Sequence, residues 1–70
     1  MKNDFKFDKW LREQLDERGW KSSDIAREAG ITRACVSLYM LGERYPSLST
    51  FLLILDAFNK KLTLVDMEDV

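Results

Sequence analysis

Apolar residues recur at helical spacing through most of the chain, and the first such run lies near the amino terminus. An amphipathic helix is predicted from about residue 5 or 8 to Arg18, with an inward stripe of Phe7, Leu11 and Leu15. Gly19 is a favourable stop, and Trp20 beyond it can pack back on the last turn. We interpret Trp10 and Trp20 as core residues, with a ligand-binding or partner-binding pair as the alternative.

Residues 22–48 contain two short helical patterns joined by a glycine. Ser22 can cap the first helix, Asp24 favours its first turn through the helix dipole, and the inward stripe is Ile25, Ala26 and Ala29. Gly30 can take the left-handed conformation that ends a helix, and Thr32 offers its hydroxyl as the next cap. This layout predicts a helix-turn-helix, the motif that sets its second helix in the major groove of DNA.

The second of these helices should run from about Arg33 to Leu41 and stop at Gly42. At about 100° per residue, its inner side carries Cys35, Val36 and Tyr39, and its outer side carries Arg33, Ala34, Ser37, Leu38 and Leu41. The outer face is therefore free to contact a ligand. Periodicity alone leaves a second interpretation open, because any small helical bundle contains a corner between two helices.

A further helix is predicted after Pro46, with Ser47 as its cap. Its buried stripe is expected to comprise Leu48, Phe51, Leu52, Leu55 and Phe58. The apolar surface extends beyond that stripe at Leu53, Ile54 and Ala57. Because 70 residues provide little protein to cover such a helix, we expect a second subunit to bury these three side chains.

The pattern changes to a period of two after Asn59, which can take the left-handed conformation that stops a helix. Residues 61–65 alternate and favour β structure, so a short strand is predicted within residues 60–66. A lone strand in a helical domain lacks a mate, and we expect Leu62 and Leu64 to lie in a strand that pairs with its copy in a homodimer. A frayed tail and an extended helix are the alternatives.

Several spaced elements of the sequence resemble, in order, the Cro and phage-repressor class of helix-turn-helix proteins, often called Xre-like. They are Gly30-Ile31-Thr32, Val36-Ser37, Gly42-Glu43-Arg44 and Pro46-Ser47-Leu48, followed by the apolar helix. The resemblance covers roughly residues 10–58 and implies a mainly α, lambda-repressor-like DNA-binding domain of four to five short helices within residues 1–70. The predicted terminal strand resembles the antitoxin branch of this family, in which a short strand pairs across the dimer.

Double-stranded DNA is the partner that the resemblance implies, together with a set of contact residues. It implies base contacts at Arg33, Ala34, Ser37 and Leu38, and phosphate contacts at Ser22, Ser23, Arg27, Thr32 and Arg44. Arg33 suits bidentate bonding to guanine, whereas Ala34 and Leu38 can contact thymine methyls. The chain departs from the family at Leu38, Met40 and Leu41, where polar or charged side chains are common.

The charge balance argues mildly against nucleic acid, since 11 basic and 12 acidic residues give a net charge of −1. Three of the acidic residues, Asp66, Glu68 and Asp69, lie at the carboxyl end, so residues 1–65 carry 11 basic and 9 acidic groups. A local cationic patch binds phosphate, whatever the total charge. With few cations, sequence-independent affinity should be weak and specific binding should depend on a dimer.

An enzyme, a cofactor and a metal site are not expected. The chain has no histidine, no glycine-rich phosphate loop and no metal-ligand spacing. We interpret Cys35 as a small buried hydrophobe, with a redox-sensing thiol as the alternative. No apolar run is long enough to span a membrane and no signal sequence is recognisable, so a cytoplasmic location is expected.

Three functional interpretations use this fold. The first is a homodimeric repressor that binds a pseudo-palindromic operator, for example in a phage or mobile-element operon. The second is an antitoxin that also neutralises a toxin protein through the first helix or the acidic tail. The third is a protein-interaction module that has lost DNA binding. The apolar side chains of Leu38, Met40 and Leu41 favour this third interpretation. DNA binding separates the third from the others, and the neighbouring gene separates the first two.

Overall fold

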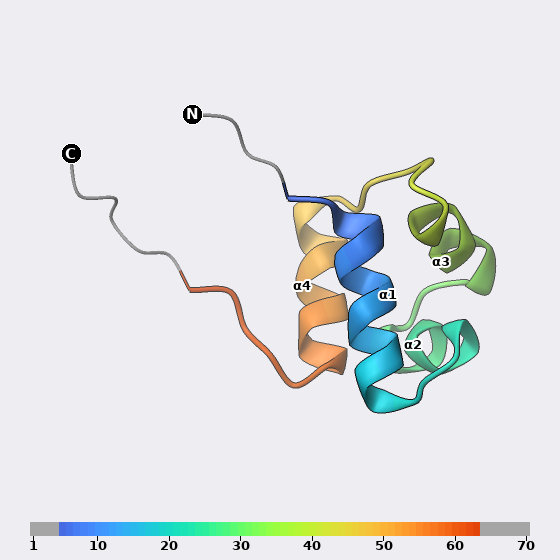
Figure 1. Cartoon of the computed structure of the whole chain (residues 1–70). Helices are drawn as coiled ribbons and strands as arrows, with labels where there is room; N and C mark the ends of the chain where they lie inside the picture. Colours follow the sequence, from blue (N-terminus) through green and yellow to red (C-terminus); the bar gives the residue numbers. More distant parts are fainter. Residues whose placement is uncertain (1–4, 64–70) are drawn as a thin grey trace.

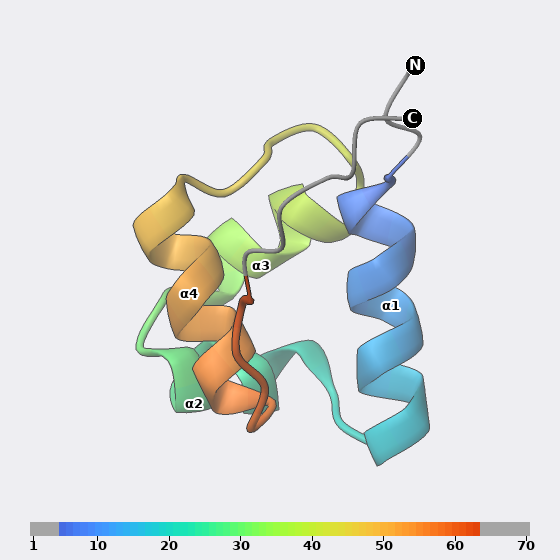
Figure 2. The same ribbon diagram turned by 90° about the vertical axis from the view of Figure 1, so that its left-hand side faces the viewer.

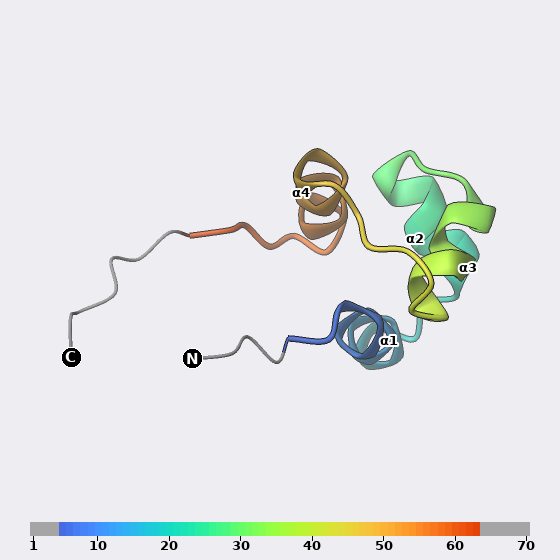
Figure 3. The same cartoon turned by 90° about the horizontal axis from the view of Figure 1, so that it is seen from above.

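A computed structural model describes residues 5–63 of the chain. Within them, four helices follow one another: α1 (Phe7–Arg18), α2 (Ser22–Ala29), α3 (Arg33–Met40) and α4 (Leu48–Ala57). Helices α1 and α4 face each other, and α2 and α3 lie together on one side of that pair (Figure 1, Figure 3). The predicted mainly α fold is confirmed.

One hydrophobic core joins the four helices. Its buried members are Phe7, Leu11 and Leu15 of α1, Ile25, Ala26 and Ala29 of α2, Val36 and Tyr39 of α3, and Ile54 and Phe58 of α4 and its carboxyl end. Both tryptophans pack against this core, as predicted: the Trp10 and Trp20 rings lie 5.9 and 5.6 Å from the Phe58 ring, centroid to centroid. These aromatic contacts connect α1 with the end of α4.

Arg18 fastens the carboxyl end of α1 to that of α4. Its guanidinium donates a hydrogen bond to the Phe58 carbonyl and stands 4.8 Å from the centroid of the Phe58 ring. A cation at this place satisfies a carbonyl of the last helical turn and interacts favourably with the aromatic face. Asn59 follows with φ 59°, which confirms the predicted left-handed stop.

The apolar surface of α4 differs from the prediction at three positions. Ile54 is fully buried at 0% exposure, so it belongs to the chain's own core and not to an exposed face. Leu48 and Leu52 were predicted in the buried stripe but are 65% and 43% exposed. The physical reason is that α4 packs mainly on α2, with Ile54 and Phe58 turned inward, and this rotates the buried stripe away from both leucines.

The predicted strand of residues 60–66 is not seen in the part that the structure describes. Residues 60–63 have no regular secondary structure, and Leu64 lies outside the described residues. Since the predicted ladder needs the backbone of a second copy, the single chain leaves residues 60–63 unpaired. They leave α4 on the side away from α2 and α3, so that in Figure 2 this tail crosses in front and α3 lies behind. Leu62 is 46% exposed there.

Candidate DNA-binding surface

A three-residue turn, Gly30-Ile31-Thr32, joins α2 to α3. Gly30 has φ 73°, and the amides of Gly30 and Ile31 close α2 by donating to the carbonyls of Arg27 and Ala26 at 3.3 and 2.9 Å. Ile31 packs against the core, and the Thr32 hydroxyl oxygen accepts the Cys35 amide at 3.1 Å. The predicted glycine stop and threonine cap are confirmed, and together they fix how α3 leaves α2.

The start of α2 is capped differently from the prediction. Ser22 is the first helical residue and Lys21 precedes the helix, so Ser22 is not the cap. The Asp24 carboxylate instead accepts the Lys21 amide at 2.8 Å. This bond lowers the pKa of Asp24, partial burial opposes it, and the neighbouring Arg27 adds to the lowering. An acidic residue three positions after the flanking residue was the signal in the sequence.

The inner side of α3 is anchored by Val36 and Tyr39, which are 1% and 3% exposed. The Tyr39 hydroxyl lies near the side chains of Cys35 and of Thr50 in α4. Burial, followed by the Cys35 contact, raises the pKa of Tyr39 to about 12, although Arg44 and Thr50 act in the opposite direction. Folded Tyr39 therefore keeps its proton to a higher pH than a free tyrosine.

The carboxyl end of α3 is held by α1. The Arg12 guanidinium donates to the Met40 carbonyl at 2.6 Å, which places a cation at the negative end of the helix dipole. The chain then turns at Gly42 with φ 76°, where a Cβ atom would lie 3.1 Å from the Asp8 carboxylate oxygen. Glycine is therefore favoured here by its left-handed conformation, and a Cβ atom would in addition press against the Asp8 carboxylate.

The outward face of α3 carries the four predicted base-contact residues. Arg33, Ala34 and Ser37 are exposed, and Leu38 is half-buried. Leu41 directly follows the helix, is 68% exposed and lies on the same side as Ala34, because residues seven apart nearly coincide in helical rotation. Among the described residues, the Arg33 guanidinium has neither an ion-pair nor a hydrogen-bond partner. This face is open to a ligand.

The predicted phosphate contacts lie around α3 but differ in what they already bind. Ser22 and Ser23 are half-buried in the first turn of α2, while Thr32 and Arg44 are exposed before and after α3. Among residues 5–63, Arg44 takes part in no salt bridge. It is therefore free to approach a phosphate.

Arg27 is exposed but already paired with two carboxylates. Its guanidinium lies 3.3 Å from an Asp24 oxygen and 3.7 Å from a Glu28 oxygen. A phosphate at Arg27 would compete with both acidic side chains, so its electrostatic contribution should be smaller than that of Arg44.

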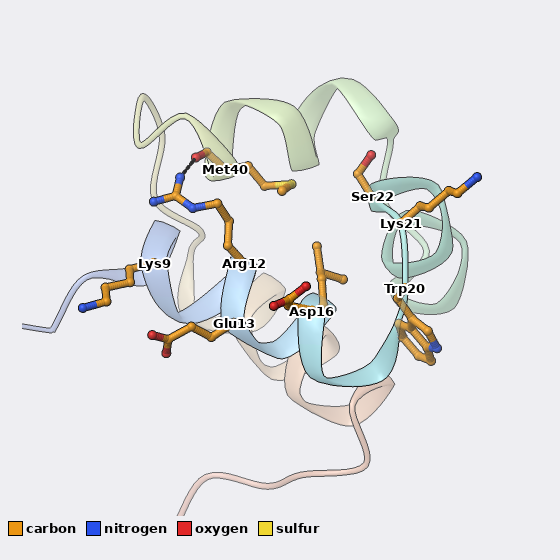
Figure 4. A pocket seen from close by; sticks show the side chains of 9 residues that line it. Lys9, Arg12, Glu13, Asp16, Trp20, Lys21, Ser22 and Met40 are labelled. Atoms are coloured by element: carbon orange, nitrogen blue, oxygen red, sulfur yellow. Dashed lines mark hydrogen bonds between the residues drawn. The ribbon is translucent and has the colours of Figure 1, made fainter.

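A groove of about 490 Å³ lies between α1, the start of α2 and the end of α3 (Figure 4). It is lined by Lys9, Arg12, Glu13, Leu15, Asp16, Trp20, Lys21, Ser22 and Met40. In Figure 4, Asp16 points into this groove, whereas Lys9 and Lys21 point outward. The carboxylate disfavours a phosphate inside the groove, so a DNA backbone near Ser22 would have to pass along its rim.

The geometry defines a helix-turn-helix, in which α2 is the first helix and α3 the second. The Cro/C1-type, Xre-like helix-turn-helix family profile matches residues 11–65, and the chain belongs to this family of DNA-binding regulators, which is not a family of enzymes. No curated protein and no solved structure matches the chain. The family resemblance predicted from the sequence is confirmed.

None of the helices within residues 5–63 is long and apolar enough to cross a membrane. Within the same residues, no group of three or more histidine, cysteine, aspartate or glutamate side chains could hold a metal ion.

Proposed function

We propose that this regulator is a homodimeric repressor that binds a pseudo-palindromic operator through α3 of each subunit. The observation that carries the proposal is the open outward face of α3, on which Arg33 and Ser37 supply polar groups. The Arg33 guanidinium suits the O6 and N7 atoms of guanine, and the Ser37 hydroxyl can bond to several bases. Base readout through Arg33, Ala34, Ser37 and Leu38 therefore remains the assignment that we favour.

The backbone contacts in this proposal come from residues that flank α3. Arg44 and Thr32 stand beyond its two ends, and Ser22 and Ser23 lie at the start of α2, where unpaired helix amides favour an anion. Arg27 is the weakest of the five because Asp24 and Glu28 already neutralise it. A small number of phosphate contacts implies weak sequence-independent binding.

A dimer is part of the proposal because one α3 offers few polar contacts. Leu53 is 50% exposed, Ala57 is half-buried beside it in the helical rotation, and Leu62 is 46% exposed on the tail after α4. Leu64 would continue this apolar series beyond the described residues. To bind successive major grooves, a two-fold dimer that covers these side chains must hold its two α3 helices about 34–36 Å apart. Ile54 is excluded from this interface by its burial.

The test is selection from a pool of random DNA duplexes, followed by sedimentation of the protein with the selected duplex. The proposal predicts inverted half-sites with centres about 10 bp apart and two chains bound to each duplex. Selected sites without two-fold symmetry, or a single chain bound at full affinity, would contradict it. Repression is then measured by placing the selected site over the promoter of a reporter gene.

The antitoxin function is a second candidate, and one observation favours it. A separate apolar groove of about 290 Å³ is lined by Phe5, Phe7, Tyr45, Pro46, Leu48 and Phe51. Tyr45 and Leu48 are 67% and 65% exposed there, and an apolar surface of this kind suits a protein partner. If a toxin gene adjoins this one, the two products should co-purify, and Leu48→Asp should prevent this while DNA binding persists. Retained co-purification of that variant would exclude the groove.

A further inference from the structure

We propose that this protein recognises its DNA site largely through the C5-methyl groups of thymine, which Ala34, Leu38 and Leu41 contact. This inference rests on the proposed operator binding by α3 and specifies the chemistry of that binding. The inference is drawn from an apolar strip along the middle of the outward face of α3, which is formed by Ala34, Leu38 and Leu41. Arg33 and Ser37 border the strip on one side only.

The direction of the strip follows from what α3 buries. Val36 and Tyr39 face the core, so the opposite side of the helix points away from the protein. Ala34 and Leu41 lie within about 20° of each other in helical rotation, and Leu38 lies about 40° from Ala34 on the other side. These three side chains therefore occupy the centre of the outward face.

Leu41 has a well-defined place at the end of the strip. Its backbone angles, φ −84° and ψ −8°, keep it in the right-handed helical region, so its side chain continues the helical pattern. Gly42 then turns the chain away with φ 76°, and the bond from Arg12 to the Met40 carbonyl holds this last turn. Leu41 is thus the last side chain that α3 presents, at 68% exposure.

Alkyl side chains can distinguish base pairs in one way. They neither donate nor accept hydrogen bonds, so they cannot read the polar edges of the bases. In the major groove, the apolar feature of the four ordinary bases is the C5-methyl group of thymine. Burying one methyl group strengthens binding about fourfold, because each buried CH₂-sized group contributes about 0.8 kcal/mol. Two symmetric half-sites raise this to an effect on the order of tenfold for one contacted position.

An apolar recognition helix also suits a protein partner, and the observations favour DNA. The strip is one side chain wide and begins beside Arg33, a cation without an intramolecular partner among residues 5–63. The profile of a DNA-binding family matches the chain across α2 and α3. A face that serves a protein partner instead would leave the chain without any preferred duplex, which is one outcome of the following experiment.

The experiment starts from a duplex selected out of a random pool. Each thymine in turn is replaced by 2′-deoxyuridine, which pairs identically but lacks the C5-methyl group, and affinity is measured by titration. We expect a loss of about fourfold per contacted methyl and no change at thymines outside the α3 contacts. Specific binding that is unaffected by every uracil would overturn the inference and leave the proposed function intact. Absence of any preferred duplex would instead overturn the proposed function.

Variants assign the methyl effect to the protein. Leu41→Ala and Leu38→Ala should each reduce the loss caused by uracil at one thymine position towards onefold, as a double-mutant cycle between side chain and methyl group. Arg33→Ala is the matched control. It should weaken binding to the thymine duplex and to the uracil-substituted duplex equally, so that the ratio of the two affinities stays unchanged. If both leucine variants keep the full uracil effect, the effect belongs to the DNA and the inference is wrong. Circular dichroism confirms that each variant is folded.

Discussion

Helices α3 and α4 both bury one side in the same core, yet their exposed leucines have different surroundings. Leu41 stands at the end of the apolar strip that it forms with Ala34 and Leu38, and the polar residues Arg33 and Ser37 border that strip. Leu53 adjoins half-buried Ala57 on a helix that carries one charged residue, Asp56, and leads into an exposed tail. Exposure of a leucine therefore does not identify its partner. The neighbouring groups do, and they favour DNA for α3 and a second subunit for α4.

The largest expected effect comes from breaking the proposed dimer at α4. Leu53→Asp places a charge in the interface and should abolish operator-specific binding, a loss of at least about a thousandfold, while the monomer stays folded. Sedimentation and titration on operator and scrambled duplexes measure it. Asp56→Ala, on the same helix, is a matched surface control and should remain dimeric. A monomeric Leu53→Asp protein that binds the operator with undiminished affinity would contradict the account.

Two adjacent residues of α4 sharpen the comparison of its faces. Ile54→Ala should lower the free energy of unfolding by about 2–5 kcal/mol, because it leaves a cavity in the core. Leu53→Ala should lower the intrinsic stability of the monomer by less than about 1 kcal/mol, since that side chain is half exposed. Urea unfolding, at protein concentrations too low for the dimer to form, measures the loss of stability in both variants. Equal losses would mean that α4 is rotated differently.

The contact between the two helices at Tyr39 should make stability depend on alkaline pH. Burial raises the pKa of Tyr39 from 10.0 to about 12, so the folded state keeps its proton where the unfolded state loses it. This contribution to stability is full below pH 10 and is lost as pH rises towards 12, a change on the order of 2 kcal/mol. Denaturant unfolding from pH 9 to 12 should show the decline, and Tyr39→Phe should flatten it. An identical decline in the variant would assign it to other groups.

Removing the guanine contact on α3 should have a smaller effect than breaking the dimer. Arg33→Ala should weaken operator binding by about 1–3 kcal/mol and relax the preference at one guanine in each half-site. Scrambled duplex should be bound nearly as before. A titration on both duplexes decides the outcome, because equal weakening on both would make Arg33 a phosphate contact.

The smallest effect compares two arginines on the flanks of α3. Arg44→Ala should weaken binding to all duplexes alike and make the slope of log affinity against log salt shallower by about one unit. Arg27→Ala should change the slope less, because Arg27 is paired with Asp24 and Glu28. Titrations between about 50 and 200 mM salt measure the slopes. A larger change for Arg27 than for Arg44 would reverse the assignment.

Several local features of the fold were predicted from local signals in the sequence, although the cap of α2 was not. The Gly30 stop and the caps at Thr32 and Ser47 depend on residues within a few positions, and the structure contains all three. Periodicity located α4 but not its rotation, because Ile54 and Leu53 are both apolar and the packing of α4 on α2 decides which is buried.

Long-range contacts had no signal in the sequence. Arg12 reaches the Met40 carbonyl across 28 positions, and Arg18 reaches that of Phe58 across 40 positions. Nothing in the spacing of the arginines identifies a backbone carbonyl as their partner, since every residue has one. The outward face of α3 was predictable because it depends only on helical geometry and on which neighbours are apolar.

The outward face of α3 is proposed to read the DNA sequence. The most direct test of this proposal is the ratio of affinities for the selected duplex and a scrambled duplex at about 0.15 M salt, measured for the natural chain and for Ala34→Asp. Ala34 lies in the first turn of α3, where an acidic residue suits the helix dipole, so the variant should fold. We predict a ratio of at least about a thousand for the natural chain and a ratio near one for Ala34→Asp. Equal affinities of the natural chain for both duplexes, or an unchanged ratio in the variant, would contradict the account.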